Sequence, residues 1–194
     1  EGIFVFQGSN PDIDVNVGDK VRVSGLVDEF FNMTQVDSLT NLLVCDTGLT
    51  LPAATEIVLP LESSGALEAV EGMLVTFPQE LVISEYFDFD RYGEIVLTSA
   101  RLYQPTAVFN PETPESALLA ASNALNQVLL DDGRTSQNPD PAIHPNGEEF
   151  TLDNRFRGGD RVYDVTGVVN YAFNEYRVQP IQGAGYIAVN ERTE

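Results

Sequence analysis

The sequence has very few of the residues on which common catalytic and metal sites are built. Among 194 residues there is one cysteine, Cys45, one histidine, His144, and one lysine, Lys20. A single cysteine excludes an intrachain disulfide framework and a zinc site made of several thiolates. There is also no run of eighteen or more apolar residues, so no membrane span is expected.

Positive charge is scarce as well. The chain carries 30 acidic and 10 basic residues, a formal net charge of −20. Such a field repels phosphate and excludes a protein that holds nucleic acid by overall basicity. Hydrophobic residues at 43% and aromatics at 9% still provide a core for one large domain or two small ones. Many acids with one lysine are typical of a soluble secreted protein from a salty environment, although a lineage bias gives the same composition.

The chain begins at Glu1 and ends at Glu194 without a signal peptide in front. We therefore expect it to be a segment of a longer polypeptide, with its function divided between this segment and other parts.

Short apolar runs with β-branched residues dominate the pattern and predict antiparallel strands. These runs lie at 3–6, 21–27, 73–77, 81–83 and 94–98. One stretch differs, because Thr113 followed by Pro114 and Glu115 is a helix start, and apolar residues at helical spacing follow. This predicts a helix over 114–125, with Leu118, Ala121, Leu125 and Val128 on one face. The polar, proline-containing segment 134–149 predicts a long surface loop.

An internal repeat relates the two ends of the sequence. NVGDKV at 16–21 is matched by RGGDRV at 157–162, Gly25-Leu26-Val27 by Gly167-Val168-Val169, and Phe31-Asn32 by Phe173-Asn174. The second copy is one residue longer, which indicates a bulge. Each copy predicts a tight turn, a strand bent at a glycine and a hairpin, as a small barrel requires.

The expected fold is therefore mainly β: two fused, related OB-fold-like Greek-key barrels with one inserted α-helix and a long loop. We place the first unit at 1–105 and the helix, loop and second unit at 106–194. Strands within 71–105 can belong to either unit.

Candidate catalytic groups are few. His144 has no partner histidine and stands in the polar loop, where a solvated role is expected, and Cys45 is expected to be a buried strand residue. No nucleophile elbow, phosphate-binding loop or dinucleotide fingerprint is present. We therefore expect no catalytic residue in this segment.

One group of oxygen-bearing side chains could bind calcium. Asp131, Asp132, Asn138 and Asp140 are hard ligands within ten residues, although their spacing is not that of an EF-hand. A plain turn and loop explain the same residues. Asp88 and Asp90 form a weaker candidate, for which an exposed strand edge is the plainer explanation.

The basic residues favour the second half of the chain. Residues 1–100 carry 17 acids and 3 bases, whereas 155–177 carry four arginines against three acids. Arginine beside aromatic rings is typical of grooves that bind single-stranded nucleic acid. The candidate contacts are Arg155, Arg157, Arg161 and Arg177 for phosphate, and Tyr171 and Tyr176 for base stacking. Core packing of the aromatics and ion pairing of the arginines are the alternatives.

Several short blocks resemble, in order, a region of large secreted bacterial nucleases of the ExeM/NucH type. They are 2–6, 17–25, 34–36, 71–75, 91–94, 104–106, 130–133 and 176–180. The resemblance implies an OB-fold-like region that precedes a metal-dependent endonuclease/exonuclease/phosphatase domain. The motifs of that catalytic domain are not found here, so no catalytic residue is carried over.

The resemblance thus implies a non-catalytic accessory module of a secreted, extracellular nuclease. Its expected partners are DNA or RNA, bound weakly by the second unit, and the catalytic domain of the same polypeptide, which it could instead position. The alternative function is a calcium-stabilised structural or protein-interaction module without nucleic-acid contact. No cofactor is required in either case, and calcium is the one candidate ion.

Overall fold

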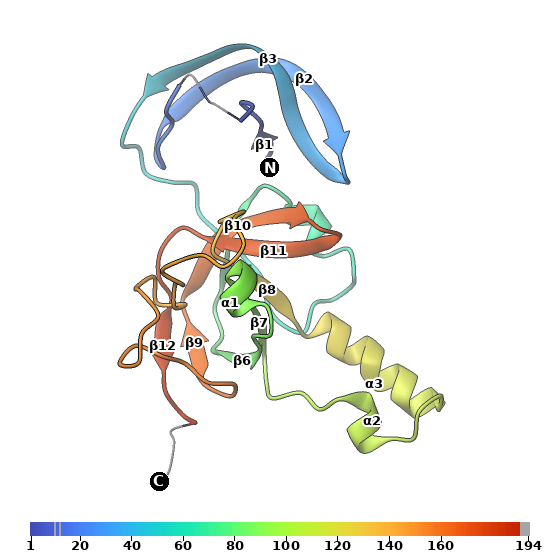
Figure 1. Ribbon diagram of the computed structural model, residues 1–194. Coiled ribbons are helices and arrows are strands. Elements are labelled where there is room, and N and C mark those ends of the chain that lie inside the picture. Colours follow the sequence, from blue (N-terminus) through green and yellow to red (C-terminus); the bar gives the residue numbers. More distant parts are fainter. Residues whose placement is uncertain (10, 12, 191–194) are drawn as a thin grey trace.

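The computed structural model describes residues 1–9, 11 and 13–190 (Figure 1). This part of the chain is mainly β, with strands in two sheets and few helices. The strands are β1 (Phe4–Val5), β2 (Lys20–Phe30), β3 (Met33–Asp46), β4 (Thr55–Glu56), β5 (Leu74–Phe77), β6 (Leu81–Glu85), β7 (Glu94–Thr98), β8 (Val128–Asp131), β9 (Arg161–Tyr163), β10 (Val165–Ala172), β11 (Glu175–Pro180) and β12 (Gly185–Ile187). The helices are a 3₁₀ turn (Glu68–Val70), α1 (Phe89–Tyr92), α2 (Pro105–Val108) and α3 (Pro114–Leu125).

The first sheet contains β1, β3 and β2, in this order across the sheet. β2 and β3 form a long antiparallel hairpin, and the short β1 pairs in parallel with β3. The hairpin arches over β1 at the top of the molecule in Figure 1. Among the described residues, β2 has no strand on its outer side, and neither has β1.

The second sheet curls into a barrel. β6, β7 and β8 form an antiparallel meander, β8 pairs in parallel with β11, and β11 pairs with β10. β10 pairs with β5, and β9 pairs with β6. Because β5 and β6 follow one another in the chain, these two pairings close the barrel. Counting β5 with β6 and β9 with β10 as single bent strands, this is the five-stranded Greek-key order of an OB-fold. The mainly β, OB-like prediction is confirmed.

The barrel contains the hydrophobic core. Its most buried side chains come from the inward positions of every barrel strand, and they include Val75, Phe77, Leu81, Ile83, Leu97, Val162, Val165, Val169 and Val178, each at most 1% exposed. Alternation along the strands produces this set, because every second residue of a strand points to the same face. The strands of residues 71–105, which the sequence left open to either unit, all lie in this barrel.

Helix α3 begins and ends as the sequence predicts. The Thr113 hydroxyl accepts a hydrogen bond from the Ser116 amide, and Pro114 occupies the first turn. Together with α2, α3 extends away from the barrel (Figure 1). The predicted apolar face is only partly used: Leu125 packs on the core, Leu118 is 71% exposed, and Val128 belongs to strand β8 rather than to the helix. None of the described helices has both the length and the apolar character needed to cross a membrane.

The internal repeat has the same backbone geometry in both copies. In each Gly-Asp turn the glycine has a positive φ, 92° at Gly18 and 97° at Gly159. The aspartate side chain then accepts a hydrogen bond from the amide three residues earlier, at 2.8 Å in both copies. The hairpin turns Phe31-Asn32 and Phe173-Asn174 also have positive φ at both residues, as a type I′ turn requires.

The register repeats as well. Val27 pairs with Val36 in the first hairpin, and Val169 pairs with Val178 in the second. A Cβ on Gly25 or Gly167 would lie 2.4 or 2.3 Å from a backbone oxygen of the facing strand, so both strands need glycine at the bend. The extra residue of the second copy falls at Asp164, which has φ 55° and separates β9 from β10. This is the expected irregularity.

Further expectations about single residues are wrong. Asp88 and Asp90 do not lie on a strand edge, because Asp88 is the N-cap of α1 and Asp90 lies in its first turn. Cys45 is exposed, because the first sheet is open and does not enclose a core around it. His144 is 1% exposed rather than solvated. It packs among Phe150, Phe156 and Tyr186, so part of the long loop folds onto its own aromatic cluster.

Candidate functional site

Two regions of the barrel contain the four arginines predicted to bind nucleic acid. The first, which we call the barrel groove, lies where β7, β8 and β11 meet the turns before β7 and after β10. It is a cavity of about 460 Å³ lined by Asp88, Glu94, Asp131, Arg134, Phe173 and Arg177 among others. OB-fold proteins bind ligands on this face, formed by the second and third strands and by the loops 1–2 and 4–5.

Arg177 is the central side chain of the barrel groove. It is 3% exposed, and its Nη1 lies 2.6 Å from both Glu94 Oε1 and Asp131 Oδ2. Its Nη2 donates to the Ala172 carbonyl, and its guanidinium lies over the ring of Phe173, 5.4 Å from the centroid. Burial alone would lower the pKa of Arg177, but the two carboxylates outweigh it and raise that pKa. The guanidinium is therefore engaged within the protein.

This geometry argues against the prediction that Arg177 contacts phosphate. The barrel groove is lined by four carboxylates, including Glu175, and two arginines, Arg134 and Arg177. Burial also raises the pKa of Glu94, with Arg177 opposing. A net negative groove around a paired arginine repels a phosphate backbone.

The predicted stacking tyrosines lie apart from Arg177. Tyr171 and Tyr176 face each other across β10 and β11, with ring centroids 4.7 Å apart. Arg177 pairs with Asn170 one position along, so it points to the opposite face of the hairpin. The Tyr176 hydroxyl also donates to Glu68. The structure brings the two tyrosines together, but as half-buried partners of each other and not beside the arginines.

Two of the four predicted calcium ligands are also engaged within the protein. Asp131 binds Arg177 and the Gly133 amide, whereas Asp132 binds the side chain of Arg134 at 2.6 Å and its amide. Asn138 adopts φ 52° in the loop, and Asp140 is exposed. Within the described residues no group of three or more His, Cys, Asp or Glu side chains is placed to hold a metal ion.

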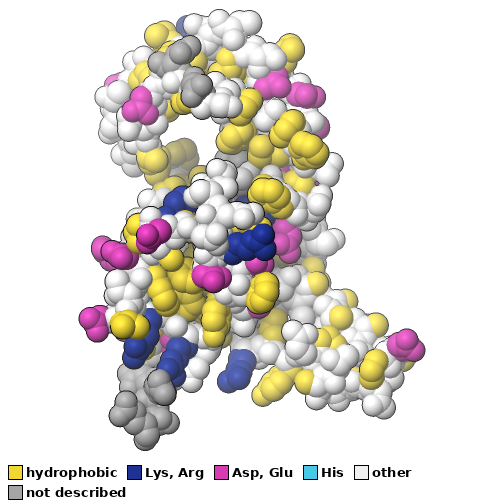
Figure 2. Space-filling model, viewed as in Figure 1, with side chains coloured by type: hydrophobic (Ala, Val, Ile, Leu, Met, Phe, Trp, Pro, Cys, Tyr) yellow, Lys and Arg dark blue, Asp and Glu magenta, His cyan; other side chains and the backbone are white. Residues whose placement is uncertain are grey.

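The second region, which we call the arginine end, contains the other three predicted arginines and Arg101. Arg155 and Arg157 precede the Gly158-Gly159 turn, and Arg161 begins β9 after it. Arg101 and Arg161 line one depression of about 480 Å³ with Gly159. In Figure 2 basic side chains are visible at the lower end of the molecule, near the C-terminus.

Asp160 fixes the backbone of the arginine end. It is 2% exposed and accepts hydrogen bonds from the amides of Arg157, Val189 and Asn190 and from the Tyr186 hydroxyl. Burial alone would raise the pKa of Asp160, but these four donors outweigh it and lower the pKa. The carboxylate is thus charged and internally satisfied, and the turn that carries the arginines is held in place.

Three of these arginines, Arg101, Arg155 and Arg161, are exposed, and Arg157 is half-buried. Arg161 and Tyr163 alternate with the buried Val162 on β9, so both point outward. Arg161 pairs with Glu80 at 2.8 Å, but both side chains are about half exposed, 50% and 48%, and such surface pairs are weak. The sequence analysis missed Arg101 and Tyr163. The alternation R-V-Y after the Gly-Asp turn could have indicated that Tyr163 faces outward like Arg161. Arg101 could not be found that way, because only the folded chain brings it to β9.

Comparisons with known proteins give one family. Neither the curated proteins nor the solved structures contain a match to this chain. A family model described as a domain of unknown function, DUF8508, matches residues 63–191. The match spans 129 of the 194 residues, begins after β4 and includes every strand from β5 to β12. It therefore covers the barrel with both candidate regions, and we identify the chain as a member of the DUF8508 family.

Proposed function

We propose that this chain is a non-catalytic, OB-like accessory module of a secreted nuclease, and that it contacts single-stranded nucleic acid through the arginine end. The observation that carries the proposal is the arrangement of Arg101 and Arg161 around one depression, beside the outward-facing Tyr163. Guanidinium groups pair with phosphates, and a neighbouring ring offers a face on which a base can stack.

Local charge supports this choice of surface. Among the described residues that line this depression, the charged side chains are Arg101, Arg161 and Glu80. Arg155 and Arg157 lie a few positions before Arg161 in the chain, beside the internally bonded Asp160. The chain as a whole is acidic, with a net charge of −20. Contact would therefore be restricted to this end, and binding would be weak and strongly dependent on salt.

A binding assay tests the proposal directly. Fluorescently labelled single-stranded DNA and RNA are titrated with the chain at low and moderate salt. We expect measurable affinity at low salt that falls as salt rises, with a slope of roughly 0.7 per phosphate contacted. Replacement of Arg101, Arg155, Arg157 and Arg161 by alanine is expected to remove most of this binding.

A matched control removes positive charge elsewhere. Lys20 and Arg22 are exposed on β2 of the first sheet, far along the chain from the arginine end. Their replacement by alanine is expected to leave binding nearly unchanged. Absence of binding by the unmutated chain at low salt would reject nucleic-acid contact, and the proposed module would then serve to position the catalytic domain.

A calcium-stabilised module remains the second candidate, and the structure offers it less support. Asp131 and Asp132 would have to leave Arg177 and Arg134 to bind an ion. Because calcium needs six to eight oxygen ligands, the remaining groups would also have to rearrange around it.

A further inference from the structure

The first sheet carries valines at the positions that form the core in the barrel, but these valines are not buried. Val21, Val23, Val27 and Val36 occupy the repeat positions of Val162, Val165, Val169 and Val178. The four barrel residues are at most 1% exposed. In the first sheet Val21 is 37% and Val27 is 70% exposed, and the other two are half-buried.

Strand β1 extends this equivalence. Phe4 and Val5 pair in parallel with Gln35 and Val36, just as Leu129 and Leu130 of β8 pair with Arg177 and Val178. Ile3 and Val5 therefore correspond to Val128 and Leu130, which are 2% and 5% exposed in the barrel, whereas Ile3 is 43% exposed. β1 thus repeats β8, and the whole first sheet repeats the β8–β11–β10 part of the barrel.

What the first sheet lacks is the other part of the barrel. In the barrel, β7 pairs with the outer side of β8, and β5 and β6 pair with the outer sides of β10 and β9. The equivalent outer sides of β1 and β2 have no strand among the described residues. Unpaired edges next to exposed valines are unfavourable in water and favour strand addition.

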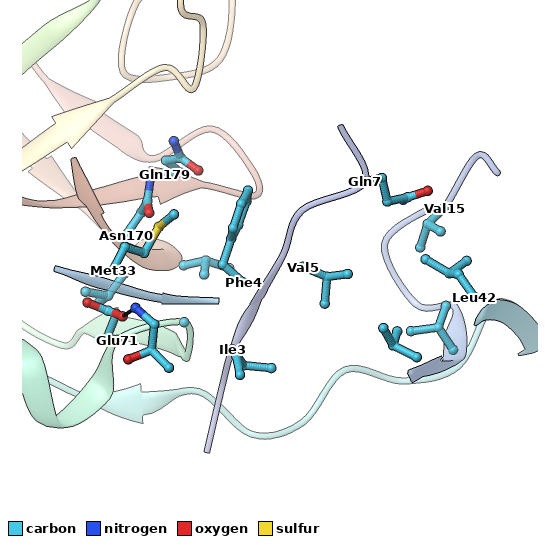
Figure 3. Close-up of a pocket in the computed structure, with 16 residues that line it drawn as sticks. Ile3, Phe4, Val5, Gln7, Val15, Met33, Leu42, Glu71, Asn170 and Gln179 are labelled. Carbon is cyan, nitrogen blue, oxygen red and sulfur yellow. Dashed lines mark hydrogen bonds between the residues drawn. The ribbon is translucent and has the colours of Figure 1, made fainter. Parts of the chain in front are cut away.

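A cavity marks the place of the missing strands. It measures about 340 Å³ and lies between the first sheet and the barrel, lined mainly by apolar residues that include Val5, Val21, Val23 and Leu42. In Figure 3, Phe4 points toward Asn170 and Gln179 of the barrel, whereas Val5 points away from them toward Val15 and Leu42. Figure 2 shows the molecule hollowed below the arch of the first sheet.

We propose that two further strands of the same polypeptide, one arranged like the bent strand β5–β6 and one like β7, are joined to β1 on its N-terminal side and close the first sheet into a second barrel. Chain order in the repeat supports this choice of occupant, since β5, β6 and β7 precede β8 in the barrel. The added strands pair with the outer sides of β1 and β2 and cover Ile3, Val21 and Val27. This inference is independent of nucleic-acid binding.

The first test is amide hydrogen exchange of the unmodified chain. We expect peptides from β2 to exchange at least about a hundredfold faster than peptides from β10, because β2 has one open edge and little burial. Equal protection of β2 and β10 in a monomer would overturn the proposal, since no strands would then be missing. A stable dimer that protects β1 and β2 would also overturn it, because a second copy would be the occupant.

The second test supplies the missing strands. A copy of residues 73–98, which contains β5, β6 and β7, is fused through a short glycine-rich turn before residue 1 of the full chain. We expect exchange in β2 to slow at least about tenfold and binding of a dye specific for exposed apolar surface to fall. The matched control carries serine in place of Leu81, Ile83 and Leu97 within the added copy only.

Two results decide the second test. Protection of β2 by the apolar copy but not by the serine copy supports the proposal, and Val27→Asp in the fused chain should abolish that protection. No change of β2 exchange in the fused chain, with the original barrel still folded by circular dichroism, would overturn it.

Discussion

The two hairpin units of this chain share their local sequence and backbone geometry but differ in what surrounds them. Val27 and Val169 have the same residue type, the same strand position and the same kind of valine partner. Val169 is 1% exposed because β5, β6 and β7 complete a barrel around it, whereas Val27 is 70% exposed. Turn geometry and register are therefore encoded locally, but burial depends on strands from elsewhere in the chain.

The largest expected effect comes from placing a charge at these two equivalent valines. Val169→Asp buries a carboxylate in the barrel core and should cost about 3 kcal/mol or more, enough to unfold much of the barrel population. Val27→Asp should change the free energy of unfolding by no more than about 0.5 kcal/mol. Chemical denaturation followed by circular dichroism measures both. Comparable losses in the two variants would contradict the difference in burial.

The next effect concerns Arg177 and its repeat partner Gln35, which are both 3% exposed. Arg177→Gln makes the barrel resemble the first sheet at this position and leaves Glu94 and Asp131 without a cation. We expect a loss of about 3 kcal/mol in stability, because the carboxylates remain buried and unpaired. Thermal denaturation measures the loss.

A combined variant separates the ion pair from the packing of Arg177. When Glu94→Gln and Asp131→Asn accompany Arg177→Gln, no charge remains to be compensated, and much of the lost stability should return. A triple variant less stable than the single one would show that the arginine acts through packing alone.

A smaller expected effect is a pH dependence of stability that arises in the barrel and not in the first sheet. Burial lowers the pKa of His144, the single histidine of the chain, and the first sheet contains none. The unfolded chain therefore binds a proton near pH 6.5 before the folded one does, so stability falls as pH drops below that value. Between pH 7 and 5.5 we expect a loss of up to about 1 kcal/mol, and His144→Gln should reduce it.

The measurement for His144 is the melting temperature of the two proteins across this pH range. Above pH 7 the imidazole of the unmodified chain is neutral in both the folded and the unfolded state. The two curves should therefore run parallel there, and this range serves as the control. Identical pH dependence below pH 6.5 would show that the buried imidazole does not control the transition.

The smallest expected effect is that of calcium. Asp131 and Asp132 already bind arginines, so addition of calcium or of a chelator should leave the melting temperature of the chain unchanged. A calcium-dependent rise would instead favour the calcium-stabilised module, and loss of that rise in Asp132→Asn would assign it to this loop.

Much of the fold was accessible from the sequence because it depends on neighbours in the chain. The cap at Thr113 and the proline after it determine where α3 begins, and the Gly-Asp turns and Asn-containing hairpins follow from residues a few positions apart. The repeat predicted two related barrels; the two hairpins share their register, but only the second unit closes into a barrel. Candidate sites were less accessible, because Arg177 is paired by Glu94 and Asp131, which are 83 and 46 residues away.

The sequence by itself determined helix α3, the turns, the internal repeat and the strands within 3–6, 21–27, 73–83 and 94–98, since each results from local backbone preference and side-chain alternation. Only the tertiary structure decided which unit acquires a closed core and which arginines face solvent. It also decided that Cys45 is exposed and His144 is buried. Those outcomes depend on desolvation, which is set by every segment that packs around a group. The same Val-Gly-Asp hairpin thus forms an enclosed core in one unit and an open sheet in the other.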